Sequence, residues 1–205
     1  MTAPRVSIVT TVYDRLDCLA RCLRSVQHLQ WTDFEQIVVS DCPGPAIEAA
    51  IDGLVAATGD PRIRHLPRET RANDWGMTPA FTGRRAAIGE FVCFLSDDNA
   101  YLPDHFGPLL AAFDADPGLG FVYSSCQYAG QRILASPTPM GARIDLGQPL
   151  FRRAVLPPDL PFHEFAWDWR LIHLLMTRRV RWQHHDAPSF IFRLDAYPSI
   201  REALA

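Results

Sequence analysis

Residues 90–99 read Glu-Phe-Val-Cys-Phe-Leu-Ser-Asp-Asp-Asn, an almost continuous apolar run that ends in two adjacent aspartates. Such a run is typical of a β-strand buried on both faces of a parallel sheet. Ligands of open parallel sheets bind beyond the carboxyl ends of the strands, which places Asp97 and Asp98 in a candidate site. Two adjacent carboxylates repel each other there, and a divalent cation relieves that cost. The alternative is a solvated acidic loop.

Strand-like and helical segments alternate on the N-terminal side of this stretch. Apolar runs at residues 6–12, 34–40 and 63–66 predict strands, and apolar spacing predicts helices over residues 16–26, 46–57 and 76–88. Pro79 restricts the third helix to a start near that residue. Alternating strands and helices are typical of a parallel α/β sheet with right-handed crossovers.

The pattern changes after residue 116. Residues 121–125 and 132–134 predict two strands joined by a turn at Gly130. Six of the seventeen prolines fall within residues 137–161, which favours a long irregular segment of functional importance. Helical spacing returns over residues 164–179, and two short β-like runs follow around residues 180–182 and 189–192. No repeat or linker is visible, so we expect one domain over residues 1–205.

Composition excludes several classes of protein. Twenty basic and twenty-three acidic residues give a net charge of −3, which argues against a nucleic-acid-binding protein. No stretch approaches the eighteen or more apolar residues of a membrane span. The N-terminus lacks the apolar core of a secretory signal, so we expect a cytoplasmic protein.

Polar residues follow three of the predicted strands and are expected to converge at one edge of the sheet. They are Thr11, Tyr13, Asp14 and Arg15 after the first strand, Asp41 after the second, and residues 96–99 after the fourth. Individually, Asp41 can start a turn and Asp14 can cap a helix. The chain has no Gly-rich phosphate loop, so a phosphate would be held by Arg and by Mg²⁺ or Mn²⁺ on the carboxylates.

These segments resemble family 2 glycosyltransferases of the GT-A fold. The resemblance runs through residues 6–15, 34–41, 89–99 and 102–105, and resumes at residues 167–169. It implies a single α/β GT-A domain of the nucleotide-diphospho-sugar transferase type, whose mostly parallel central sheet is flanked by helices. It also implies a nucleotide-binding half over residues 5–100 and an acceptor-side half over residues 101–205.

The resemblance carries roles to individual residues. It places Thr11, Tyr13 and Asp41 at the nucleotide base, Arg15 or Arg71 at the phosphates, Asp97 at the ribose, Asp98 on the metal and Asp168 as general base. Asp168 has an alternative as a first-turn carboxylate favoured by the helix dipole. In this fold class a late His sometimes completes the metal shell, so His185 is a candidate ligand beside His184. The alternative is a His pair that only ends a strand.

The implied activity is inverting, metal-dependent transfer of a sugar from a nucleotide sugar, most often a UDP-sugar, to a saccharide or lipid-linked hydroxyl acceptor. To reach an acceptor in the membrane, the protein would dock peripherally on the membrane surface through residues 152–153 or 178–179. There are two departures from the family pattern: Ala80-Phe81 replace an Arg-Asn pair, and Trp167 replaces a Glu but leaves the presumed base Asp168. The short chain and the missing Arg-Asn pair favour the alternative of an inactive nucleotide-binding or scaffold protein. A nucleotidyltransferase would need a basic glycine-rich loop, which we do not find.

Overall fold

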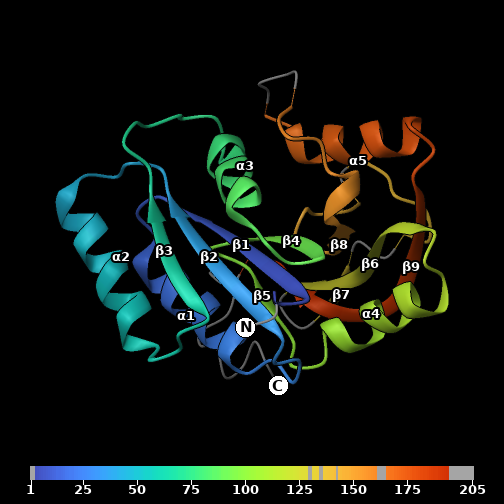
Figure 1. The fold of residues 1–205 in the computed structure, drawn as a ribbon, viewed down its shortest axis with the longest axis horizontal. Coiled ribbons are helices and arrows are strands. Elements are labelled where there is room, and N and C mark those ends of the chain that lie inside the picture. The colour runs from blue at the N-terminus through green and yellow to red at the C-terminus, as the bar shows by residue number, and fades with distance from the viewer. Residues whose placement is uncertain (1–2, 129–130, 134–135, 142, 161–164, 194–205) are drawn as a thin grey trace.

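The computed structural model describes residues 3–128, 131–133, 136–141, 143–160 and 165–193, which form one α/β sheet structure with helices on both faces (Figure 1). The strands are β1 (Val6–Val12), β2 (Phe34–Ser40), β3 (Ile63–Pro67), β4 (Phe91–Ser96), β5 (Ala100–Tyr101), β6 (Leu119–Tyr128), β7 (Gln131–Ile133), β8 (Pro149–Arg152) and β9 (Arg181–Ile191). The helices are α1 (Leu16–Gln27), α2 (Pro45–Ala57), α3 (Met77–Ala86), α4 (Phe106–Ala115), the 3₁₀ helix η1 (Arg153–Val155) and α5 (Trp167–Thr177).

The first four strands form the parallel half of the sheet that the sequence predicts. The strand order is β3-β2-β1-β4-β8-β6-β9-β5, with β7 paired to β6. β1 pairs in parallel with both β2 and β4, and its register sets Thr11 opposite Val39 on one side and Ser96 on the other. The carboxyl ends of β1, β2 and β4 therefore lie side by side, which is the edge where ligands bind in such sheets.

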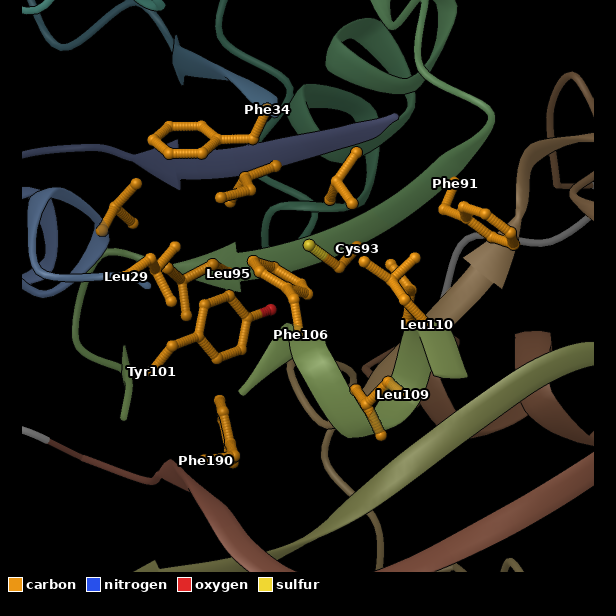
Figure 2. Close-up of a cluster of buried hydrophobic side chains, with 14 of the residues drawn as sticks. Leu29, Phe34, Phe91, Cys93, Leu95, Tyr101, Phe106, Leu109, Leu110 and Phe190 are labelled. Carbon is orange, nitrogen blue, oxygen red and sulfur yellow. The ribbon is translucent and has the colours of Figure 1, made fainter. Parts of the chain in front are cut away.

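Alternation along the strands divides the core between two faces. Ile8 and Cys93 pack with α1 and α4, in a cluster that also holds Tyr101 (Figure 2). Their neighbours Val9 and Phe94 point to the opposite face and pack with α3 and α5. Because side chains two residues apart share a face, Thr11 and Ser96 continue the α3 and α5 side of the sheet.

Gly83 allows α3 to lie close against the sheet. A Cβ atom at this position would come within 2.4 Å of Val9 Cγ1 and 3.0 Å of Val39 Cγ2. Only the absence of a side chain permits this approach. The helix in turn fixes the loop before its first residue, which borders the candidate site.

The C-terminal half corrects several sequence-based expectations. The proline-rich segment is not without regular structure, because β8 lies antiparallel between β4 and β6, and Pro149 occupies its first position, where a strand tolerates proline. The two expected β-like runs form one strand, β9, whose register shifts around Ser125 and Pro188. Helix α4 and strand β5 were not predicted, and α5 begins at Trp167. The predicted turn at Gly130 and helix start at residue 164 lie outside the described residues.

Candidate active site

Two backbone hydrogen bonds bring the segments after β2 and β4 to the end of β1. The Asp41 N–H donates to the Val12 carbonyl at 3.1 Å, and the Asp97 N–H donates to the Thr11 carbonyl at 3.2 Å. The acidic residues that follow two separate strands thus flank the end of the strand between them. The predicted convergence of these residues at one sheet edge is confirmed.

A hollow of about 360 Å³ opens at this edge, and we call it the smaller hollow. It is lined by all six residues to which the sequence assigned nucleotide or ribose contacts: Thr11, Tyr13, Arg15, Asp41, Arg71 and Asp97. Residues 73–76, in the loop before α3, complete its wall. The structure therefore gathers these six side chains around one space, and their individual roles stay predictions.

Tyr13 and Arg71 come from separate loops and meet over this hollow. The Arg71 guanidinium carbon lies 4.1 Å from the centroid of the Tyr13 ring, a cation–π contact. Both residues also line the hollow. The pair presents an aromatic surface and a positive charge to whatever binds there.

Asp41 organises the loop that contributes Arg71 and Asn73 to the wall of the smaller hollow. Its carboxylate accepts hydrogen bonds from the backbone N–H groups of Ala72 at 2.9 Å and Asn73 at 3.1 Å, and forms an ion pair with Arg68. The residue is buried. It therefore holds residues 68–73 in place, in addition to any contact it makes with a ligand.

Arg15 joins both carboxylates of the acidic pair. Its guanidinium forms an ion pair with Asp97, and its Nη1 donates to Asp98 Oδ2 at 2.5 Å. The Asp97 side chain is 1% exposed and that of Asp98 18%. Burial raises the pKa of Asp97 to about 7 although Arg15 acts to lower it. The resemblance implies Arg15 or Arg71 at the phosphates. In this structure Arg15 pairs with Asp97 and Asp98, and its role at phosphates stays a prediction.

The fit of a divalent cation can be tested on this donor set. Mg²⁺ in nucleotide sites commonly takes one or two carboxylates and completes its shell with substrate phosphates and water. Asp98 is partly exposed and lies next to a second carboxylate, so it suits that mode once Arg15 shifts. Within the described ranges, no three Asp, Glu, His or Cys side chains cluster as a closed protein site. The residues fit a cation shared with a diphosphate.

The loop after the acidic pair is anchored by the last described strand. Tyr101 and Ala100 in β5 pair with Phe190 and Ile191 in β9. The side-chain oxygen of buried Asn99 accepts a hydrogen bond from the Arg193 backbone at 2.9 Å. The position of Asp98 thus depends on residues almost a hundred positions later.

A larger cavity of about 610 Å³ adjoins the smaller hollow, and the two share Thr11, Trp75 and Ser96 in their walls. Asp168, in the first turn of α5, lines this larger cavity. Its Oδ1 accepts a hydrogen bond from the Trp169 N–H at 2.7 Å. Burial raises the pKa of Asp168, so this carboxylate is more basic than an exposed one. The predicted base and the predicted nucleotide residues therefore border connected spaces.

Asp145 is a carboxylate in the larger cavity that the sequence reasoning missed. It lies within the proline-rich segment, just before β8, where Gly147 donates its N–H to Asp145 Oδ1 at 2.8 Å. Burial raises the pKa of Asp145 to about 7, with smaller contributions from the charges of Asp168 and Asp98. An Asp two residues before a Gly is the sequence signal of this turn, but it does not indicate a site.

Two exposed aromatic side chains also line the larger cavity and were not predicted. Trp75 is 62% exposed and Phe165 is 74% exposed. Their rings meet edge to face with centroids 5.7 Å apart. Trp75 comes from the loop before α3 and Phe165 from the residues just before α5, so the pair links two elements on the same face of the sheet.

The histidines of β9 do not join a described cluster of metal-ligand side chains. His185 is paired with Ser124 of β6, and His184 stacks on Tyr123 at 4.7 Å between ring centroids. The His184 Nε2 also lies 3.1 Å from the Ser125 hydroxyl. A metal-ligand role for His185 stays a prediction.

The residues that depart from the family pattern, Ala80, Phe81 and Trp167, lie at the larger cavity or in the core beside it. Ala80 lines the larger cavity, while Phe81 is buried and packs against Trp167 with ring centroids 6.2 Å apart. Trp167, which precedes Asp168, is itself buried and donates from Nε1 to the Trp75 carbonyl at 3.1 Å. The apolar replacements therefore pack α3 against α5, and Trp167 is a core residue.

Two of the four arginines considered for membrane docking have partners within the chain. Arg152 pairs with Glu90 at 2.6 Å, and Arg153 donates from Nε to the Gly89 carbonyl at 2.7 Å. Across the described part of the chain, no helix has the length and apolar character that crossing a bilayer requires.

The fold and the site together define a domain of the GT-A glycosyltransferase class, with its acidic strand end beside a hollow. The chain belongs to glycosyl transferase family 2, whose sequence profile matches residues 7–189. The predicted family and fold are confirmed.

Relatives and solved structures are similar over most of this chain. WcaA of Escherichia coli (strain K12), provisionally named a colanic acid biosynthesis glycosyl transferase, is 22% identical over 87% of this chain and 62% of its own length. TarS (residues 1–349) of S. aureus, solved in complex with UDP, has a TM-score of 0.72 at 15% identity, covering 91% of this chain and 60% of that one. The mannosyltransferase PcManGT of Pyrobaculum calidifontis, solved with GDP-Man and Mn²⁺, has a TM-score of 0.70 at 16% identity, covering 94% and 58%.

A fourth protein is similar over a shorter part. The GalNAc(5)-diNAcBac-PP-undecaprenol beta-1,3-glucosyltransferase of Campylobacter jejuni subsp. jejuni is 25% identical over 60% of this chain and 38% of its own length. The chain thus spans about three fifths or less of the length of each of these curated relatives.

Proposed function

We propose that the chain transfers a sugar from a nucleoside-diphosphate sugar to a hydroxyl acceptor, with inversion and with a divalent cation. The observation that carries this proposal is the connection of two spaces. All six predicted nucleotide contacts line the smaller hollow, and Asp168 lines the larger cavity that shares Thr11, Trp75 and Ser96 with it. A donor that spans both spaces has its nucleotide in one and its sugar in the other.

The nucleotide is held in the half formed by residues 5–100. Tyr13 offers a ring for stacking, and the Arg71 charge lies close enough to meet a phosphate. The six residues and the solved TarS complex support UDP as the first nucleotide to test. Residues 101–205 supply the acceptor side, including Asp168.

The acidic pair would bind the ribose and the cation that offsets the charge of the diphosphate. Asp97 is buried beside the end of β1 and would accept a ribose hydroxyl hydrogen bond, while Asp98 would hold Mg²⁺ or Mn²⁺. When bound, such an ion supplies positive charge against the negative charge of the leaving diphosphate. Arg15 exchanges its carboxylate partners for phosphate oxygens as the donor arrives, because the same guanidinium serves either anion.

Asp168 acts as the general base. An acceptor alcohol is a poor nucleophile unless a base takes its proton during attack. The Trp169 N–H fixes Asp168 Oδ1, which leaves Oδ2 to accept that proton. Burial has raised the pKa of the carboxyl, which strengthens it as a base. Attack on the face opposite the diphosphate inverts the anomeric carbon.

We expect Asp168→Asn to lower kcat by about 10²–10⁴-fold, the usual contribution of a positioned base, with UDP affinity unchanged. The measurement is nucleoside diphosphate release from a panel of UDP- and GDP-sugars with Mn²⁺ and simple saccharide acceptors. Asp17→Asn, an exposed acid in the first turn of α1, is the matched control and should keep full activity. Unchanged turnover in Asp168→Asn would remove this residue from the mechanism.

A second candidate function is favoured by the ion pairs of Arg15. A guanidinium that remains on Asp97 and Asp98 would leave a nucleotide-binding protein without transfer activity. Binding of UDP by calorimetry, with no transfer or hydrolysis of any donor in the panel, would decide for this alternative.

The acceptor is proposed to be a saccharide, either free or linked to a lipid. The Campylobacter relative is named for a lipid-linked oligosaccharide substrate, which supports testing both forms. A cytoplasmic location, with peripheral contact to the inner membrane face for a lipid-linked acceptor, is part of the same proposal. Flotation of the protein with anionic vesicles tests that contact.

A further inference from the structure

The exposed pair Trp75 and Phe165 is unusual for its place in the molecule. Large aromatic side chains usually bury most of their surface, yet these are 62% and 74% exposed at the edge of a cavity. Their edge-to-face contact, with centroids 5.7 Å apart, keeps part of each ring free to contact a ligand. An exposed aromatic surface beside a cavity commonly marks a binding site.

The backbone holds Trp75 in this position at an energetic cost. Its φ is +55°, in the left-handed region that side chains rarely adopt, and Asn73 two residues earlier has φ +54°. Such residues persist only when their surroundings fix them, and they cluster at functional sites. Here the Trp167 Nε1–H donates to the Trp75 carbonyl at 3.1 Å, which ties the strained loop to α5.

The charge of the larger cavity restricts what can enter it. Among the described residues that line it, the charged side chains are Asp145 and Asp168, and none is cationic. Apolar side chains such as Phe94 and Ile144 form much of the remaining wall. A ligand with an apolar face and neutral hydroxyl donors matches this wall, whereas an anion would be repelled.

We propose that Trp75, Phe165 and Asp145 form an acceptor subsite for a neutral sugar ring. The C–H face of the ring packs against the aromatic pair, and one of its hydroxyl groups donates to Asp145. Another hydroxyl then faces Asp168. This inference rests on the proposed transferase function and assigns the acceptor class and three residues to the same site.

The subsite is placed on the acceptor side because of its exposure. In the proposed function the donor sugar is tethered to a diphosphate in the smaller hollow, which Asp97 lines. Phe165 lines only the larger cavity and is the more exposed ring, so it meets a group that arrives from solvent. A lipid tail would satisfy the rings but would offer no hydroxyl group to the Asp145 carboxylate.

The test measures glycoside binding directly, without turnover. Methyl glucoside, galactoside, mannoside and N-acetylglucosaminide, a methyl glucuronide and an octyl glucoside are examined by saturation-transfer NMR with UDP and Mg²⁺ present. We expect saturation on the ring protons of neutral glycosides and weaker binding of the glucuronide. Phe165→Ala should weaken the binding of neutral glycosides about tenfold, which corresponds to the loss of one stacking contact. Ile88→Ala, an exposed apolar residue outside the cavity, is the matched control.

Asp145→Asn provides an independent arm. Removing the negative charge should raise glucuronide binding relative to glucoside binding, while UDP affinity measured by calorimetry stays within twofold of wild type. Trp75→Ala should weaken the binding of the neutral glycosides as Phe165→Ala does. Circular dichroism and UDP binding establish that each variant is folded.

Several results would overturn the subsite. They are equal glycoside binding by wild type and Phe165→Ala, stronger binding of the glucuronide than of the glucoside by wild type, saturation on the octyl chain instead of the ring, or no glycoside binding in the presence of bound UDP. Failure of UDP to bind at all contradicts the proposed function instead, so the two failures are distinguishable.

Discussion

Arg15 holds two carboxylates of different burial with one guanidinium group. Asp97 is almost fully buried, and Asp98 is partly exposed. Two adjacent acids at a strand end would otherwise repel each other in a poorly solvated place. The ion pairs let the folded chain keep both acids before any nucleotide or cation binds.

We expect Arg15→Ala to destabilise the protein more at pH 8 than at pH 5. The pKa of Asp97 is raised to about 7, so the carboxyl is mostly protonated at pH 5 and Arg15 then stabilises little. At pH 8 the ionised Asp97 loses its partner. Because the Arg15 side chain is half exposed, solvent screening limits the loss to about 1 kcal/mol.

The measurement is urea unfolding at the two pH values. Arg181→Ala, which removes a more exposed pair with Asp116, is the control and should show little difference between pH 5 and pH 8. An equal destabilisation by Arg15→Ala at both pH values would mean that Asp97 does not titrate in this range.

Asp145→Asn should stabilise the protein increasingly as the pH rises. Burial raises the pKa of Asp145 from 3.8 to about 7, so the folded state binds the proton more tightly than the unfolded state. The stability associated with this proton is complete below about pH 4 and is lost as the pH rises through 7. An amide does not ionise and escapes that loss.

Thermal unfolding of wild type and Asp145→Asn between pH 4 and pH 8 measures the effect. The difference in Tm should grow with pH by several degrees, since about 1 kcal/mol shifts Tm by about 2–4 °C in a chain of this size. Asp17→Asn serves as the exposed control. A constant difference in Tm would show that Asp145 titrates normally.

At the scale of single elements, α3 depends on its glycine. Gly83→Ala should cost about 1–3 kcal/mol, because the new methyl group would overlap Val9 and Val39 and push the helix away from β1 and β2. Gly53→Ala in α2 is the matched control, since nothing lies within 4 Å of its added Cβ, and there alanine should stabilise by about 1 kcal/mol.

Urea unfolding of both variants distinguishes packing from helix propensity. If Gly83→Ala were more stable than wild type, α3 would be able to move away from the sheet without losing packing energy. Because α3 follows directly on the loop that carries Trp75, we also expect Gly83→Ala to weaken UDP binding, whereas Gly53→Ala should not.

The elements that the sequence predicted are those with strong local patterns. β1, β2, β4 and α1 have clear apolar periodicity, and their boundaries were found within one or two residues. β8 was missed because four residues that begin with Pro149 carry no alternation, and their pairing comes from the neighbours β4 and β6. β9 was split because the register shifts around Pro188 interrupt its pattern.

The candidate site was predictable only where it follows those strands. Thr11, Asp41 and Asp97 were found because parallel strands end at the same edge. Asp145, Trp75 and Phe165 were not, since they come from irregular segments whose convergence depends on long-range packing of α5 on α3. The ion pairs of Arg15 were also missed, because side-chain partners are not encoded by spacing alone.

At the scale of the whole molecule, UDP with Mn²⁺ should raise Tm, because a ligand that binds only the folded state stabilises it. At about 100 times its Kd, UDP adds about 2.7 kcal/mol, or about 5–10 °C. EDTA should remove most of the increase, and Asp98→Asn should lose the Mn²⁺-dependent part while retaining the metal-free part. Differential scanning fluorimetry measures all three effects. A shift unaffected by EDTA would contradict cation use at Asp98.

The bonds between β5 and β9 have a consequence for biosynthesis. Asn99 receives its backbone partner from Arg193, and Ala100 pairs with Ile191. A ribosome that has finished residues 1–100 has made the acidic loop but not the strand that fixes it. The nascent chain therefore gains a properly shaped donor pocket only after residue 193 has been made, and a product that stalls before that point would bind nucleotide poorly.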